Sequence, residues 1–214
     1  MSHASQLIVL LGAESTGKTT LARELTRILS SRGLDAVMVP EALRLFCDRI
    51  GRTPLAHEQA GIAAEQTRSI EAARAEHQIV LADTSALTIA VYSDYLFDDQ
   101  SLYTQAERDQ AQASMTLLTS LDLAWTADGL QRDGPHVREP VDALIRSALQ
   151  RIDQPYAIVA GKGVLRIQHA LSAIEHLLDA PQRQARAAMS PRWRWFCDNC
   201  DDGECEQHWL PRAR

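Results

Sequence analysis

The residues best suited to chemistry are 12 to 19, GAESTGKT, which directly follow the apolar run QLIVLL. They match G-x-x-x-x-G-K-[ST], a loop whose backbone N–H groups surround nucleotide phosphates. Lys18 would reach the β and γ phosphates, and the Thr19 hydroxyl is suited to Mg²⁺. A helix N-terminus after the loop would add a favourable field for an anion. The nucleotide-binding residues expected from this motif are Gly12, Ala13, Glu14, Ser15, Thr16, Gly17, Lys18, Thr19 and Thr20.

A Mg²⁺ ion held by Thr19 needs a carboxylate nearby, and Asp83 is the best candidate. It ends the apolar run QIVLAD, so it would lie at the carboxyl end of a strand and face the phosphate loop. Asp is also favoured as a helix N-cap, which is the alternative role for this residue. We expect Asp83 to hold Mg²⁺ directly or through water.

A second carboxylate follows another apolar run, in Pro40-Glu41. Glu41 could accept a proton from a substrate hydroxyl or hydrogen-bond a ribose. It could equally be a first-turn acid that complements a helix dipole. Arg44, one turn further on, would either aim at a phosphate or belong to a solvated face. The sequence leaves both alternatives open.

Residues 128 to 139, DGLQRDGPHVRE, combine two Gly, one Pro and two Arg with little apolar content. This composition predicts a mobile loop. Phosphoryl transfer needs positive charge over the migrating group and exclusion of water, and Arg132 and Arg138 on a closing loop would supply both. Simple solvation of a surface loop is the competing explanation, and the sequence does not decide between them.

A third kind of chemistry is indicated near the C-terminus, in RWFCDNCDDGECEQHWL. Cys197-x2-Cys200-x4-Cys205-x2-His208 has the ligand types and close pairs of a tetrahedral structural Zn²⁺ site. A closed set of four ligands leaves no open position for catalysis, so the expected role is structural. Incidental surface thiols and an iron–sulfur cluster are the alternatives.

Apolar runs alternate with helical patterns along the first 180 residues, which predicts a parallel sheet covered by helices on both faces. We expect this α/β domain at residues 1–180 and a small zinc-knuckle-like module at residues 181–214. The expected strands are 6–11, 36–40, 78–82, 121–126 and 156–160. The expected helices are 17–32, 57–76, 84–97, 105–119, 140–152 and 164–178.

The composition of the chain limits the kinds of partner that it can bind. The chain has 214 residues, a formal net charge of -6 and a pI of about 5.6, which argue against a broad nucleic-acid-binding surface. No apolar run reaches the roughly 18 residues that a membrane helix needs. The N-terminus MSHASQ lacks the basic start of a signal peptide, so we expect a cytoplasmic protein.

Six segments, taken in order, resemble the ribosylnicotinamide kinase domain of NadR-type proteins, an ATPase-like P-loop family. They are GAESTGKTTLARELT, VPEALR, the alanine-rich stretch with Gln59 and Gln66, LADTSALT, LDLAWTADGLQRDG and YAIVAGKGVLR. The resemblance covers about residues 6 to 175. It implies a P-loop NTPase of the nucleoside and nucleotide kinase type, which binds ATP and Mg²⁺ and phosphorylates nicotinamide riboside or a similar nucleoside.

By the same resemblance Asp83 is the Mg²⁺-side acid, Glu41 is the substrate-side carboxylate, and Trp125 and Asp128 line the substrate cleft. The chain departs from the family where Ala124 precedes the tryptophan and where Gln131 stands in place of an arginine. We therefore keep an alternative function: an ATP-dependent switch or ATPase whose zinc-bound C-terminal module engages a protein or nucleic-acid partner.

Overall fold

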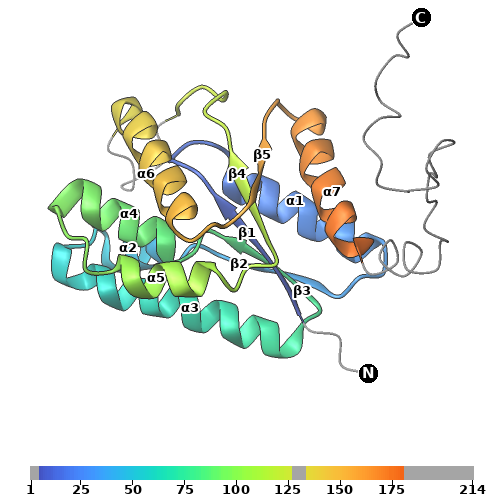
Figure 1. The fold of residues 1–214 in the computed structure, drawn as a ribbon, viewed down its shortest axis with the longest axis horizontal. Helices are drawn as coiled ribbons and strands as arrows, with labels where there is room; N and C mark the ends of the chain where they lie inside the picture. Colours follow the sequence, from blue (N-terminus) through green and yellow to red (C-terminus); the bar gives the residue numbers. More distant parts are fainter. Residues whose placement is uncertain (1–4, 127–133, 181–214) are drawn as a thin grey trace, which may run out of the picture. The chain divides into compact units, whose positions relative to one another are not determined.

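The computed structural model describes residues 5–126 and 134–180. Its centre is a sheet of five parallel strands, as expected from the sequence, and the structure places them in the order β2-β3-β1-β4-β5 (Figure 1). The strands are β1 (Gln6–Leu11), β2 (Ala36–Val39), β3 (Ile79–Asp83), β4 (Met115–Thr119) and β5 (Tyr156–Val159).

After Gln6, strand β1 is apolar because it lies at the centre of the sheet, between β3 and β4. Side chains of a strand alternate between its two faces, so both faces of β1 must be apolar. Leu7, Val9 and Leu11 join the largest buried cluster. Ile8 and Leu10 are buried outside that cluster, which places them on the opposite face.

The helices that cover the sheet form two layers. Figure 1 shows α1 and α7 on one face and the group α3 to α6 on the other. Within that group α3 packs on α4, and α4 packs on α5 and α6. The helices are α1 (Lys18–Ser31), α2 (Ala42–Ile50), α3 (Gln59–Glu76), α4 (Ala86–Phe97), α5 (Tyr103–Gln110), α6 (Arg138–Arg151) and α7 (Val164–Leu178), with short 3₁₀ turns η1 (Ala56–Glu58) and η2 (Pro135–Val137).

The prediction of the fourth strand at 121–126 is wrong, and so is that of a helix over 105–119. Helix α5 ends at Gln110, and Met115–Thr119 form the strand. The error has a physical cause, because the threonines of MTLLT make it look half-polar. In the fold Thr116 accepts a hydrogen bond from Gln110 Nε2 at 2.9 Å, and the Thr119 hydroxyl lies 3.0 Å from Leu11 O. Satisfied hydroxyls of this kind can occupy a buried strand.

The loop expected at 128–139 is also shorter than predicted at its C-terminal end. Residues 127–133 lie outside the described part of the chain, but η2 begins at Pro135 and α6 begins at Arg138. Proline at the first position of a helical turn needs no N–H partner there, so a residue that indicated a loop instead starts the turn. Helix α2 likewise has no counterpart among the expected helices.

The chain divides into two compact units, Met1–Leu177 and Leu178–Arg214. The predicted zinc-knuckle-like module at 181–214 lies outside the described residues. Within the described ranges no helix is long and apolar enough to cross a membrane.

Candidate active site

The phosphate loop joins the end of β1 to the start of α1, as its motif predicts. Gly12 and Gly17 have φ values of 147° and 76°, which side chains with a Cβ rarely adopt. A Cβ on Gly12 would also collide with Thr119 Oγ1 of β4. The loop is braced from inside, because Thr16 Oγ1 donates to Ala13 O at 2.8 Å and lies 2.8 Å from Thr119 Oγ1. Its shape is thus set by the neighbouring strand as well as by its glycines.

Lys18 is the first residue of α1, so its side chain starts at the positive end of the helix. Its Nζ donates to Gly12 O at 2.8 Å and to Ala13 O at 3.0 Å. These bonds hold the ammonium group across the mouth of the loop. The arrangement places one cation where the phosphates of a nucleotide would lie.

Asp83 is placed beside the loop by the sheet. It ends β3, pairs in register with Leu10 of β1, and is 1% exposed. Neither of its carboxylate oxygens has a hydrogen-bond partner among the described residues. Ser85, two residues later, is the residue that caps α4, so the alternative N-cap role does not apply to Asp83. A buried carboxylate without a protein partner fits a Mg²⁺ ion or its water shell.

No group of three or more His, Cys, Asp or Glu residues that could hold a metal occurs within 5–126 and 134–180. This finding does not count against Mg²⁺ in a phosphate-loop site, where one acid, the Thr19 hydroxyl and the nucleotide share the ion. The predicted zinc ligands Cys197, Cys200, Cys205 and His208 lie outside the described residues, and zinc remains a prediction from sequence.

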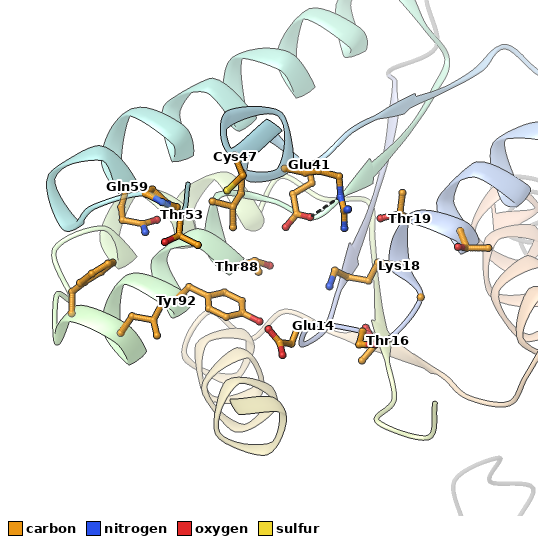
Figure 2. Close-up of a pocket in the computed structure, with 18 of the residues that line it drawn as sticks. Glu14, Thr16, Lys18, Thr19, Glu41, Cys47, Thr53, Gln59, Thr88 and Tyr92 are labelled. Carbon is orange, nitrogen blue, oxygen red and sulfur yellow. Dashed lines mark ion pairs between the residues drawn. The ribbon is translucent and has the colours of Figure 1, made fainter. Parts of the chain in front are cut away.

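A cavity of about 620 Å³ extends away from the loop (Figure 2). In the view Lys18 and Thr19 lie at one end, and Gln59 and Thr53 lie at the other. Helix α2, the segment before η1, the start of α3, and α4 supply the walls between them. The cavity therefore has a phosphate end and a far end, and it continues well beyond the loop that binds phosphate.

Glu41 and Arg44, two residues whose roles the sequence left open, both line this cavity. Glu41 is the N-cap residue of α2, but its side chain does not cap the helix. Its Oε2 lies 4.0 Å from Arg44 Nε, and the Glu41 side chain is 14% exposed. The two side chains form a loose ion pair on the cavity wall, so neither belongs to a fully solvated face.

Trp125, expected to line the substrate cleft, has a different position. Its indole Nε1 donates to Glu14 Oε1 of the phosphate loop at 2.7 Å, and it is not among the residues that line the cavity. Thr126 N donates to Ser15 Oγ at 2.8 Å, and Gly134 N donates to Glu14 Oε1 at 3.1 Å. Residues on both sides of the 127–133 segment are thereby tied to the phosphate loop.

The remaining candidates divide in two. Asp128 and Arg132 lie outside the described residues. Arg138 is the first residue of α6 and is 8% exposed, and its Nη1 donates to Leu123 O at 2.9 Å. Its Nε and Nη2 have no partner among the described residues. Arg138 is therefore held beside the loop after β4, and its part in phosphoryl transfer stays a prediction.

Sequence reasoning missed a network centred on Arg166 of α7. Arg166 is 5% exposed, and its Nη2 donates to Thr16 O of the phosphate loop at 2.8 Å. Its Nη1 donates to Asp122 Oδ1 at 2.8 Å and to Gly161 O at 2.9 Å. One guanidinium thus joins three segments that are far apart in the chain. The only signal in the sequence was an arginine within an otherwise apolar stretch, GVLRI.

The network predicts that the Asp122 carboxylate contributes a pH-dependent part of the stability. Replacing Asp122 by Asn should remove this part. Burial alone would raise the pKa of Asp122, but hydrogen bonds from Arg166 and from the Gly161 amide lower it from 3.8 to about 2. A carboxyl group whose pKa is lower in the folded protein stabilises the fold at pH values above its ordinary pKa. This contribution is lost as the pH falls toward the lowered pKa. We expect Asp122→Asn to lower the free energy of unfolding at pH 6.

Urea unfolding of both proteins between pH 6 and pH 2.5 tests this expectation. The difference between wild type and Asp122→Asn should be constant above about pH 4 and should shrink below it. The exposed pair Arg27–Glu24, 3.0 Å apart on α1, offers a control, because Glu24→Gln should change stability little at any pH. A difference that stays constant down to pH 2.5 would contradict the assignment.

Solved structures confirm the fold class. NadR protein in complex with NR has a TM-score of 0.66 and 20% identity, with 82% of this chain and 51% of that chain covered. NadR protein in complex with NAD and AMP-PNP has a TM-score of 0.65 and 20% identity, with 82% of this chain and 50% of that chain covered. The matched part of this chain thus spans about half the length of those NadR chains. Thymidylate kinase from Ehrlichia chaffeensis has a TM-score of 0.58 and 17% identity, with 82% of this chain and 100% of that chain covered.

At these identities the likeness concerns the fold, which is that of a P-loop NTPase with nucleotide-kinase-like neighbours. No curated protein matches the chain. A family model described as an AAA domain matches residues 7–166, from the first strand to the arginine that braces the phosphate loop. The chain therefore belongs to this AAA-domain family of P-loop proteins.

Proposed function

We propose that the protein is an ATP- and Mg²⁺-dependent small-molecule kinase that phosphorylates a hydroxyl group of a nucleoside, nicotinamide riboside or a similar compound. One observation carries the proposal: the cavity of about 620 Å³ begins at the phosphate loop and continues beyond it. An ATPase that transfers phosphate only to water needs no such room, whereas a kinase must hold its acceptor next to the γ-phosphate. The NadR structure that contains NR supports the choice of acceptor.

The residues of the phosphate loop, the cavity wall and the end of β3 can be given roles in this reaction. The backbone of the loop and Lys18 would bind the phosphates of ATP. Thr19 and Asp83 would hold Mg²⁺, which neutralises charge on the phosphate oxygens. Glu41 would take the proton of the acceptor hydroxyl while the acceptor oxygen bonds to the γ-phosphorus and ADP leaves. Arg44 would keep the Glu41 carboxylate oriented toward the cavity.

The test is ADP release measured across a panel of nucleosides, with phosphorylated products identified by mass spectrometry. Release that depends on an added nucleoside, with one phosphate gained by that nucleoside, is the expected result. ADP release at the same rate without any acceptor would contradict the kinase and favour the ATPase alternative.

Replacing Glu41 by Gln should lower kcat roughly 10²- to 10⁴-fold, because the variant cannot take up the acceptor proton. The KM for ATP should change little. A matched control is Glu139→Gln, which removes an acid from the first turn of α6, away from the cavity. Equal losses in the two variants would mean that Glu41 acts only through the helix dipole.

A further inference from the structure

The cavity contains buried polar atoms that have no partner within the described part of the chain. Gln59, the first residue of α3, and Thr88 of α4 line the cavity and are each 3% exposed. Gln59 Oε1 and Thr88 Oγ1 have no hydrogen-bond partner among the described residues. Figure 2 shows Gln59 at the end remote from Lys18, with Thr88 between them in the view. Buried polar atoms are nearly always paired, so two unpaired ones in one cavity indicate a ligand.

A second glutamine of the same helix shows what a structural role looks like. Gln66 follows Gln59 by seven residues, which is two helical turns, so both lie on one face of α3. Gln66 is 0% exposed, yet its amide is satisfied within the protein. Its Oε1 accepts from Ala42 N at 2.7 Å, and its Nε2 donates to Pro40 O at 3.4 Å. Gln59 is equally buried without such partners for its oxygen, which destabilises the fold unless a ligand provides them.

The surroundings of Gln59 restrict the ligand further. The cavity wall also contains Leu43, Leu55, Tyr92 and Phe97, so most of a bound group would touch apolar or aromatic surface. The backbone around Leu55 is held by Glu58, whose Oε2 accepts from Leu55 N and from Arg52 Nη1, each at 2.7 Å. Among the residues that the structure describes, the lysines and arginines that line the cavity are Lys18, Arg23 and Arg44. These features fit a flat ring better than a second phosphate.

We propose that Gln59 selects the acceptor by accepting a hydrogen bond from an amide N–H on its ring. This inference rests on the proposed kinase function, because the ligand of the far end is then the base of the acceptor nucleoside. A carboxamide on a pyridinium ring and a lactam within a pyrimidine ring share this chemistry. Both present an N–H to Gln59 Oε1 with a carbonyl beside it that can accept from the same side-chain amide.

The test compares two pairs of nucleosides that differ in this N–H. One pair is nicotinamide riboside and the methyl ester of nicotinic acid riboside, and the other is uridine and 3-methyluridine. In at least one of the two pairs, the wild type should prefer the N–H member about 10- to 100-fold in kcat/KM, because the analogue leaves Gln59 Oε1 unpaired. Gln59→Leu should bring that ratio close to one, mainly by raising the KM of the preferred nucleoside. No preference in either pair would overturn the proposal.

Measurements of thermal stability distinguish a ligand-binding role of Gln59 from a structural role. Gln59→Leu removes an unpaired buried oxygen, so its Tm should equal or exceed that of the wild type. Gln66→Leu leaves Ala42 N without its partner, so its Tm should fall while the preference for the N–H member remains. If Gln59→Leu does not fold, Gln59→Met, which keeps the length of the side chain, takes its place. A fall in Tm for Gln59→Leu as large as for Gln66→Leu, with the preference unchanged, would overturn the proposal.

Failure of the proposed function gives a different result. If the wild type phosphorylates none of the four nucleosides, the kinase proposal fails for these acceptors. Binding is then measured by the rise in Tm with each nucleoside, in the presence of an ATP analogue and Mg²⁺. A rise that requires the N–H and disappears in Gln59→Leu supports the assignment of Gln59, and the same rise for both members of each pair overturns it.

Discussion

Replacing Lys18 by Met lowers the rate of ADP formation by about 10³-fold and weakens the binding of an ATP analogue, while the fold remains intact. The expected loss is large because Lys18 is the cation that the structure places across the mouth of the phosphate loop, 2.8 Å from Gly12 O. A group that stabilises developing charge in a buried site is typically worth two to three powers of ten in kcat. Isothermal titration with the analogue and the acceptor-dependent assay measure the two effects.

The control for this variant is Arg27→Met on the same helix. Arg27→Met also removes one positive charge. The Arg27 side chain is 66% exposed and pairs with Glu24 at the surface. Its replacement should leave nucleotide binding unchanged and alter stability by no more than about 0.5 kcal/mol. Equal losses of binding in Lys18→Met and Arg27→Met would show that net charge, and not the position of Lys18, governs binding.

Replacing Asp83 by Asn has two opposite effects, on activity and on stability. We expect acceptor phosphorylation to fall by roughly 10²-fold and the Mg²⁺ concentration for half-maximal activity to rise, because the proposed Mg²⁺ site loses its carboxylate. Since neither Asp83 oxygen has a partner within residues 5–126 and 134–180, and the residue is 1% exposed, the variant should be more stable by about 1–3 kcal/mol. Urea unfolding without nucleotide and Mg²⁺ titration of the activity measure these effects.

Asp142 offers a comparison, since it is also buried but one of its two carboxylate oxygens is paired. Its Oδ2 accepts from Arg146 Nε at 2.6 Å. Asp142→Asn should therefore destabilise the protein and leave its Mg²⁺ dependence unchanged. If Asp83→Asn destabilises the fold and keeps the wild-type Mg²⁺ dependence, Asp83 is a structural residue and not a metal ligand.

Much of the nucleotide side of the site could be predicted from sequence because its determinants are local. The glycines of GAESTGKT supply the left-handed backbone, and the apolar run before them predicts β1. Asp83 was found in the same way, since it ends an apolar run and strands of a parallel sheet end at one edge. The fourth strand was misplaced because the pairing of Thr116 and Thr119 depends on residues that the local pattern does not contain.

The part of the cavity beyond the phosphate loop could be predicted only in part. Glu41 and Arg44 were identified, and both line the cavity. Trp125 was identified as well, but its bond to Glu14 spans 111 residues and no local pattern indicates it. Gln59 and Gln66 are equivalent in sequence, two buried positions on one face of one helix. Their difference arises because Gln66 meets the backbone of Pro40 and Ala42, whereas Gln59 meets a cavity.

By itself the sequence determined that this protein has a phosphate loop, an acid that ends the third strand, and a parallel α/β fold. These features depend on backbone conformation and on the periodicity of apolar residues, which neighbouring residues encode. The tertiary structure alone decided how the loop is braced and which polar atoms are left for a ligand. Arg166 reaches Thr16 across 150 residues, and such a contact exists only once the sheet and its helices have packed.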